Sequence, residues 1–231
     1  MSTATRPEAS SAGPSPGLVV RDLGRRPLEA VWHEMREFTE RRTPETPDEI
    51  WFVEHPPVFT LGLNADRAHV LAPGDIPVVQ IDRGGQVTYH GPGQVVAYVL
   101  VDLRRRPLDV RGLVMALENA VIRTVAGYGI RAEARRDAPG VYVDGKKLAA
   151  IGLRVRRFCS YHGIAVNVAL DLEPFTRINP CGYAGLEATQ LADLCDVDDP
   201  AVFRRDLEPR LREELSVGKI VSDTFFGEKG V

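Results

Sequence analysis

The chain has 231 residues, of which 44% are hydrophobic and 26% charged, the composition of a soluble globular protein able to bury a substantial core. A net charge of −3 and a pI near 6.0 argue against nucleic-acid binding. The sequence has no run of about 18 apolar residues, so we expect neither a transmembrane helix nor a membrane partner. Three cysteines cannot all pair within one chain, which favours a reducing cytoplasm over a disulfide-stabilised secreted protein.

Composition changes at both ends of the chain. Residues 1–17 are rich in Ser, Ala, Pro, Gly and Thr and lack an apolar signal core, which predicts a disordered lead-in. Residues 216–231 show no clear pattern and receive no assignment. We therefore expect one domain over residues 18–215, without internal repeats, acting as a monomer.

The first half of the domain is predicted to alternate strands with helices. Extended segments are expected at residues 18–20, 50–53 and 78–82, and residues 95–103 read as a buried central strand. One helix begins at Pro27, and its apolar face is formed by Leu28, Val31, Trp32, Met35 and Phe38. A longer helix is capped by Asp109 and ends at Gly127 or Gly129, and its expected inward side chains are Leu113, Val114, Leu117, Val121 and Val125.

Hairpins dominate the second half of the prediction. Residues 140–143 and 146–156 flank Asp144-Gly145, a two-residue turn typical of a β-hairpin. A further strand is expected over 161–170, a short helical turn over 171–177, and a C-terminal helix over 200–215 that Pro209 kinks or splits. This order predicts an α/β (α+β) fold, a mixed sheet packed by a few helices.

Cys181 lies in the tight segment Asn179-Pro180-Cys181-Gly182. Proline fixes its own φ and glycine permits close backbone approaches, so the thiol is presented on a loop. Such a thiol can be a nucleophile. It can equally be a small buried side chain at a turn, which is common for free cysteine.

A second unusual segment runs from Arg83 to Gly93 and contains four glycines and a proline. This composition disfavours a regular element and suits a backbone that approaches a ligand closely, although a simple glycine-rich hairpin is the alternative. Neither a Walker pattern nor Gly-x-Gly-x-x-Gly after a strand is present, so it is not a phosphate loop. Upstream, Pro56-Pro57 forms an extended corner, where His55 either lines a site or caps a strand end.

Residues 83–94 (RGGQVTYHGPGQ), 147–152 (KLAAIG), 162–168 (HGIAVNV) and 180–182 (PCG), supported by 54–62, together resemble the LipB-type octanoyltransferases of lipoate biosynthesis. The similarity extends from about residue 18 to about residue 215. It implies the biotin/lipoate protein ligase fold. It also implies transfer of an octanoyl group from acyl carrier protein to a lysine of a lipoyl domain, as found in 2-oxoacid dehydrogenase complexes and the glycine-cleavage H protein.

The resemblance also implies roles for individual residues, with no cofactor and no metal. Cys181 matches the nucleophile that carries the acyl thioester, and Lys147 matches the lysine that lowers the pKa of this cysteine and shuttles protons. Neighbouring strand residues face opposite ways, so only one of Lys146 and Lys147 can serve Cys181, and the family spacing selects Lys147. The substrate-binding segments match Arg83, Gly84, Gly85, Gln86, Val87, Thr88, Tyr89, His90, Ala150, Ile151, Gly152, Gly163, Ile164 and Ala165.

Several roles remain open from the residues alone. Backbone N–H groups near Gly84-Gly85 and Gly152 are candidate donors to an oxyanion. His90 and His162 compete with Lys147 for the role of base, while Cys159 and Cys195 read as structural. An acidic carrier protein calls for a basic docking face. The candidate arginines for it are Arg104, Arg105, Arg106, Arg135, Arg136, Arg154, Arg156 and Arg157.

Three other functions compete with the acyltransferase. An ATP-dependent lipoate or biotin ligase on the same fold would use the lysine without Cys181. A cysteine hydrolase would pair Cys181 with a histidine and release free acid. A non-catalytic carrier-binding module would bind the octanoyl carrier and form no covalent adduct.

Overall fold

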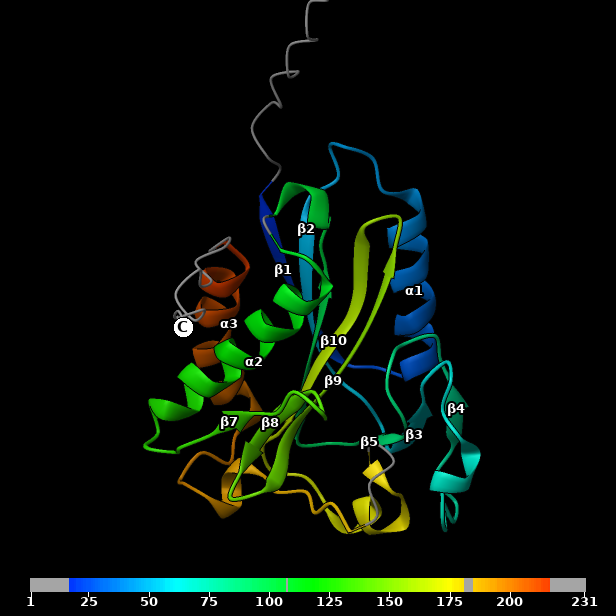
Figure 1. Ribbon diagram of the computed structural model, residues 1–231, viewed down its shortest axis with the longest axis vertical. Helices are drawn as coiled ribbons and strands as arrows, with labels where there is room; N and C mark the ends of the chain where they lie inside the picture. The colour runs from blue at the N-terminus through cyan, green and yellow to red at the C-terminus, as the bar shows by residue number, and fades with distance from the viewer. Residues whose placement is uncertain (1–16, 107, 181–184, 217–231) are drawn as a thin grey trace, which may run out of the picture.

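A seven-stranded mixed sheet runs through the molecule in the order β1-β2-β6-β10-β9-β8-β7 (Figure 1). The structure is a computed structural model and describes residues 17–106, 108–180 and 185–216. β1 and β2 are parallel, whereas all other neighbours in this sheet are antiparallel. The strands are β1 (Leu18–Arg25), β2 (Asp48–Glu54), β6 (Gln94–Leu100), β7 (Glu133–Ala134), β8 (Gly140–Val143), β9 (Lys146–Arg156) and β10 (Cys159–Asn167).

A smaller sheet lies beside the main one and joins β4 (Val78–Gln80), β3 (Val58–Leu61) and β5 (Thr88–His90) in that order. β3 is parallel to β4 and antiparallel to β5. The 3₁₀ helix η3 (Glu173–Arg177) packs against β5, and Tyr89, Phe59 and Phe175 form an aromatic cluster between them. This sheet and η3 position the glycine-rich segment after β4 against β9 of the main sheet.

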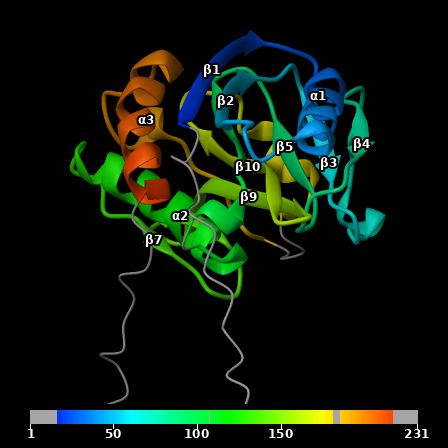
Figure 2. The ribbon, with the colours of Figure 1, turned by 90° about the horizontal axis from the view of Figure 1, so that it is seen from above.

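Helices cover both faces of the main sheet. α1 (Leu28–Arg41) packs on one face, and α2 (Val110–Ala126) and α3 (Pro200–Ser216) pack on the other (Figures 1 and 2). α2 begins as predicted, because the Asp109 side chain accepts a hydrogen bond from the N–H of Gly112. The larger core lies between the sheet and α2 and α3, so the predicted mixed sheet packed by a few helices is confirmed.

The structure corrects two details of the sequence prediction. Val114 is only half-buried, and Ala116 and Ala120 of α2 are buried instead. α3 is not split at Pro209, since one helix continues through it, and a kink there stays a prediction. Its fully buried side chains Phe203, Leu207, Leu211 and Leu215 recur every four residues and pack against α2, which holds the helix together around the proline.

The hairpin at Asp144-Gly145 has the predicted form. Asp144 and Gly145 have φ values of 48° and 78°. A two-residue turn of type I′ requires a positive φ at both of its central residues. Within the described residues, no helix combines the length and apolar character that crossing a membrane requires.

Candidate active site

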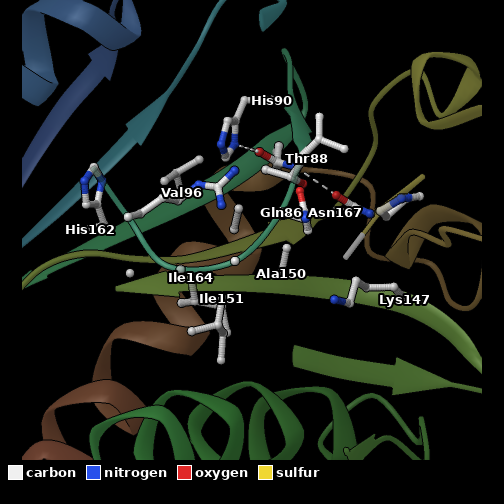
Figure 3. A pocket seen from close by; sticks show the side chains of 18 of the residues that line it. Gln86, Thr88, His90, Val96, Lys147, Ala150, Ile151, His162, Ile164 and Asn167 are labelled. Atoms are coloured by element: carbon white, nitrogen blue, oxygen red, sulfur yellow. Dashed lines mark hydrogen bonds between the residues drawn. The ribbon is translucent and has the colours of Figure 1, made fainter. Parts of the chain in front are cut away.

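An apolar pocket lies where the middle of β9, β10 and β6 meets the segment between β4 and β5 (Figure 3). It encloses about 790 Å³ of space that no atom occupies, part of it open to solvent. Its described lining is Ile81, Arg83, Gly85, Gln86, Val87, Thr88, His90, Gln94, Val96, Tyr98, Lys147, Ala150, Ile151, Gly152, His162, Gly163, Ile164, Ala165, Asn167, Phe175, Pro180, Glu187 and Ala188.

Every described residue that the resemblance assigned to substrate binding lines this pocket, except two. Tyr89 packs away from it, against Phe59 and Phe175. The N–H of Gly84 donates to the carbonyl oxygen of Leu153 at 2.9 Å, so it ties the glycine-rich segment to β9 and is not available to an oxyanion. Whether the remaining residues bind substrate stays a prediction.

Lys147 reaches the pocket because the register of β9 shifts beside β8. Val141 is opposite Ala149 but Tyr142 is opposite Lys147, which leaves Leu148 as an extra residue on β9. Ala150 and Gly152 face the pocket, so regular alternation would have directed Lys146 there. The extra residue reverses the faces: Lys147 is buried with 6% exposure and lines the pocket, whereas Lys146 is exposed and pairs with Glu187 at 2.6 Å.

Polar and aromatic groups of β8 and the preceding turn surround the ammonium of Lys147. Nζ donates to the carbonyl oxygen of Pro139 at 3.3 Å and lies 5.2 Å from the ring centre of Tyr142, where a cation is attracted by the ring. The Tyr142 hydroxyl donates to the carbonyl of Ala138 at 2.7 Å, which fixes the ring. Lys147 lies at one end of the pocket and His162 at the other (Figure 3).

A chain of hydrogen bonds connects His90 to the opposite wall. Nδ1 of His90 donates to Oε1 of Gln94 at 2.7 Å, and Nε2 of Gln94 donates to Oδ1 of Asn167 at 3.0 Å (Figure 3). Nδ2 of Asn167 in turn donates to the carbonyl of Thr189. Burial lowers the pKa of His90 to about 3. An imidazole with so low a pKa accepts a proton poorly, so His90 orders the pocket wall and is a weak candidate for the base.

His162 is held by a carboxylate. Its Nε2 donates to Oδ1 of Asp82 at 3.1 Å, and Tyr161 and Trp32 donate to the same carboxylate. Burial acts to raise the pKa of Asp82, but these three hydrogen bonds hold it well below its usual range. Burial also lowers the pKa of His162. His162 is therefore neutral and oriented, at the end of the pocket away from Lys147.

Arg83 is a buried part of the pocket wall, with 7% exposure. Its guanidinium donates to the carbonyl and the hydroxyl of Thr60 at 2.7 and 2.8 Å. A Cβ on Gly152 would lie 2.6 Å from Cδ of Arg83, so only glycine allows the arginine to pass over β9 here. The Arg-Gly-Gly motif and the motif that ends at Gly152 therefore meet where the Arg83 side chain packs on Gly152.

Cys181 lies outside the described residues, so its relation to Lys147 stays a prediction. Its neighbour Pro180 lines the pocket. Cys159, in contrast, is buried at the start of β10, and burial raises the pKa of its thiol, as expected for an unreactive cysteine. In the described part of the chain, no group of three His, Cys, Asp or Glu side chains is arranged to hold a metal ion.

His55 sits behind the pocket wall. It is fully buried, its Nδ1 donates to the carbonyl of Arg26, and its Nε2 accepts from the hydroxyl of Tyr98, both at 2.7 Å. Since Tyr98 lines the pocket and His55 does not, His55 supports the site from behind.

The arginine run after β6 has a structural role. Arg106 and Arg42 pair with Asp48, which has only 1% exposure, and Arg105 lies 3.7 Å from the same carboxylate. Of the three arginines in the run, Arg104 alone has a largely exposed side chain. Reversing all three charges would therefore disrupt the fold, and carrier docking at this run stays a prediction.

Some pocket residues were not predicted from the sequence. Others lie in the quoted motifs but were not assigned to substrate binding. Gln94 and Asn167 lie within the motifs that carried the resemblance. Val96 and Tyr98 follow Gln94 at every second position of β6, so alternation along the strand could have found them. Phe175 comes from η3, and Glu187 and Ala188 come from an irregular segment; no local signal places these three residues at the pocket.

Comparison with known proteins agrees with this architecture. The family described as lipoyl protein ligase A/B catalytic domain matches residues 27–215. A bi-partite lipoate protein ligase from Thermoplasma acidophilum superimposes with a TM-score of 0.69, covering 90% of this chain and 88% of its own; at 15% identity, this likeness concerns the fold.

Curated relatives are much closer in sequence. An octanoyltransferase of Alkalilimnicola ehrlichii is 64% identical over 183 residues, which is 78% of this chain and 85% of that protein. An octanoyltransferase of Methylococcus capsulatus is 58% identical over 201 residues, covering 85% of this chain and 97% of that protein. The chain belongs to the lipoyl protein ligase A/B catalytic-domain family and, within it, to the octanoyltransferases.

Proposed function

We propose that this octanoyltransferase carries the octanoyl group on Cys181, with Lys147 as its proton-transfer partner. The donor is octanoyl-acyl carrier protein, and the acceptor is a lysine of a lipoyl domain in a 2-oxoacid dehydrogenase complex or in the glycine-cleavage H protein. The observation that supports this most directly is the buried Lys147 at one end of an apolar pocket whose lining includes Pro180, the residue before Cys181. We place the reaction in the cytoplasm, where thiols remain reduced.

The reaction proceeds in two transfers. The Cys181 thiolate attacks the donor thioester carbonyl, a new S–C bond forms, and the carrier thiolate leaves with a proton from the Lys147 ammonium. The neutral amine of the acceptor lysine then attacks the enzyme thioester, and Lys147 accepts the proton that this amine loses. Amide formation restores the Cys181 thiolate. Exchange of one thioester for another is nearly thermoneutral and the amide makes the second transfer favourable, so no nucleotide is consumed.

The pocket supplies the binding energy for the acyl chain. At about 0.8 kcal/mol for each buried methylene, an octanoyl chain gains about 5 kcal/mol from apolar walls such as Val96, Ile164 and Phe175. One methylene more or less changes this by only about 1–3 kcal/mol. We therefore expect a soft preference for chain length, with decanoyl donors also loading Cys181.

The test is to incubate the protein with octanoyl-acyl carrier protein without ATP, then measure intact mass and map the peptides. We expect an octanoyl-sized, hydroxylamine-labile adduct on Cys181 that disappears when a lipoyl domain is added. Cys181→Ser is the matched control: it should not form a hydroxylamine-labile thioester and should fail to modify the lipoyl domain.

Two outcomes would replace this mechanism. Modification of the lipoyl domain only when ATP and free octanoate are supplied would identify an ATP-dependent ligase. Release of free octanoate, without transfer to the domain, would identify a cysteine hydrolase.

A further inference from the structure

Glu118 is a buried carboxyl that none of the steps above uses. It lies on α2 with 6% exposure, and its Oε1 accepts a hydrogen bond of 2.9 Å from the N–H of Gly140 at the start of β8. A buried carboxyl is costly unless its interactions compensate. This one is directed at a single backbone peptide, between Pro139 and Gly140.

The other end of that peptide contacts Lys147. The carbonyl of Pro139 and the N–H of Gly140 belong to one peptide unit, and in a trans peptide they point in opposite directions. The carbonyl accepts the hydrogen bond from Nζ of Lys147 at 3.3 Å, while the N–H donates to Glu118. Carboxylate, peptide and ammonium therefore form one continuous hydrogen-bonded chain, in which each bond polarises the next.

Gly140 makes this peptide easy to reorient unless it is held. Its φ is +142°, a conformation that side chains rarely permit, and a Cβ there would lie 2.4 Å from the carbonyl oxygen of Ala149 and 3.1 Å from Cε of Lys147. The site thus requires a glycine directly against the lysine. A glycine-flanked peptide has weak conformational preferences of its own, so its orientation depends on its hydrogen-bond partners.

We propose that Glu118 is a positioning residue for Lys147: it holds the Pro139–Gly140 peptide with its carbonyl toward Nζ and favours the ammonium form. This inference rests on the proposed function of Lys147 in acyl transfer. Burial raises the pKa of Glu118, and the Gly140 N–H and the positive charge of Lys147 act against that rise, so the two side chains interact electrostatically. Tyr142 of β8 faces Lys147, Arg135 lies over the same tyrosine ring, and Glu187 lies near Lys147, paired with Lys146.

Two substitutions separate orientation from charge. Glu118→Gln keeps an oxygen that accepts from Gly140 but removes the negative charge, so we expect the alkaline limb of the pH profile of octanoyl transfer to move down by about half a pH unit or more. Glu118→Ala removes the acceptor and frees the peptide. We expect kcat to fall about tenfold or more while KM for the octanoyl donor stays within about twofold.

Labelling of the Lys147 amine provides a readout that does not need transferase activity. The rate of its reaction with acetic anhydride is measured against pH, and in Glu118→Gln the rise should begin at lower pH than in the unmodified chain. Glu49→Gln is the matched control, because Glu49 is an equally buried carboxyl on β2, bound by Arg21 and Trp51 and outside the pocket lining. Its labelling and transfer profiles should not move.

Superimposed Glu118→Gln and unmodified profiles would overturn the inference, as would a kcat for Glu118→Ala within about twofold of the unmodified protein. If Cys181 never carries an acyl group, the proposed function fails, and the labelling profile still decides whether Glu118 acts on Lys147.

Discussion

At the scale of single residues, the neighbours Lys146 and Lys147 offer a matched pair. Lys147 is buried in the pocket wall, and Lys146 is exposed and paired with Glu187. Lys147→Gln should lower octanoyl transfer to a lipoyl domain by about 10²-fold or more, because the proton donor and acceptor is lost. Lys146→Gln should stay within about twofold, since a surface ion pair contributes little. Initial rates decide this, and comparable loss in both variants would contradict the assignment of Lys147.

The same pair shows how far the orientation of single side chains could be predicted from the sequence. Alternation correctly predicts that the two lysines face opposite sides, but the extra residue Leu148 decides which side each one faces. That shift lies in the pairing of β9 with β8, and strict alternation along a single strand does not anticipate it. Only the spacing shared with a known family selected Lys147. Similarly, Tyr89 stood inside the expected binding motif and turned out to pack against Phe175, because the small sheet sets its direction.

At the scale of elements, Pro209 makes α3 a test of helix stability. It is exposed in the interior of a helix that continues from Pro200 to Ser216, where a proline removes one backbone hydrogen bond. Pro209→Ala should raise the free energy of unfolding by about 1–2 kcal/mol, after allowing for the greater freedom of the unfolded alanine chain. Urea unfolding measures this. Transfer activity should be unchanged, and a loss of stability would show that the proline relieves strain in α3.

Most elements could be predicted from local patterns, and their ends could not. The 3.6-residue period, Asp109 as a cap and the Asp144-Gly145 turn each have a local physical cause, and the structure contains the corresponding helices and hairpin. The strand expected at residues 50–53 starts instead at Asp48. That residue reads as part of a polar loop, yet Arg42 and Arg106 bury it, and these partners come from separate parts of the chain.

At the scale of the whole molecule, the pocket is a product of topology. β6, β9 and β10 bring together residues that are far apart in sequence, and the small sheet adds the glycine-rich segment. Composition and periodicity predict the class of fold but not this juxtaposition, because strand order depends on long-range pairing. Only the family resemblance grouped these segments into one predicted site. Cys181 lies outside the described residues, so the pairing of its thiol with Lys147 is a prediction that only the resemblance supports.

The buried histidines in and behind the pocket wall make the stability of the whole domain sensitive to acid. Burial lowers the pKa of His55 from 6.5 to about 4, so between these values the unfolded chain binds a proton that the folded protein does not. The contribution of neutral His55 to the free energy of unfolding is fully present above pH 6.5. It falls as the pH is lowered, and about 3 kcal/mol of it is lost at pH 4. His90, with a pKa lowered to about 3, adds in the same direction.

Urea unfolding from pH 7 to pH 4 should show a shallower decline in the free energy of unfolding for His55→Gln than for the unmodified chain. His33→Gln, an exposed position on α1, should leave the slope as it is. An unchanged slope in His55→Gln would mean that acid acts through other groups, because the histidine could then not be the site of differential proton binding.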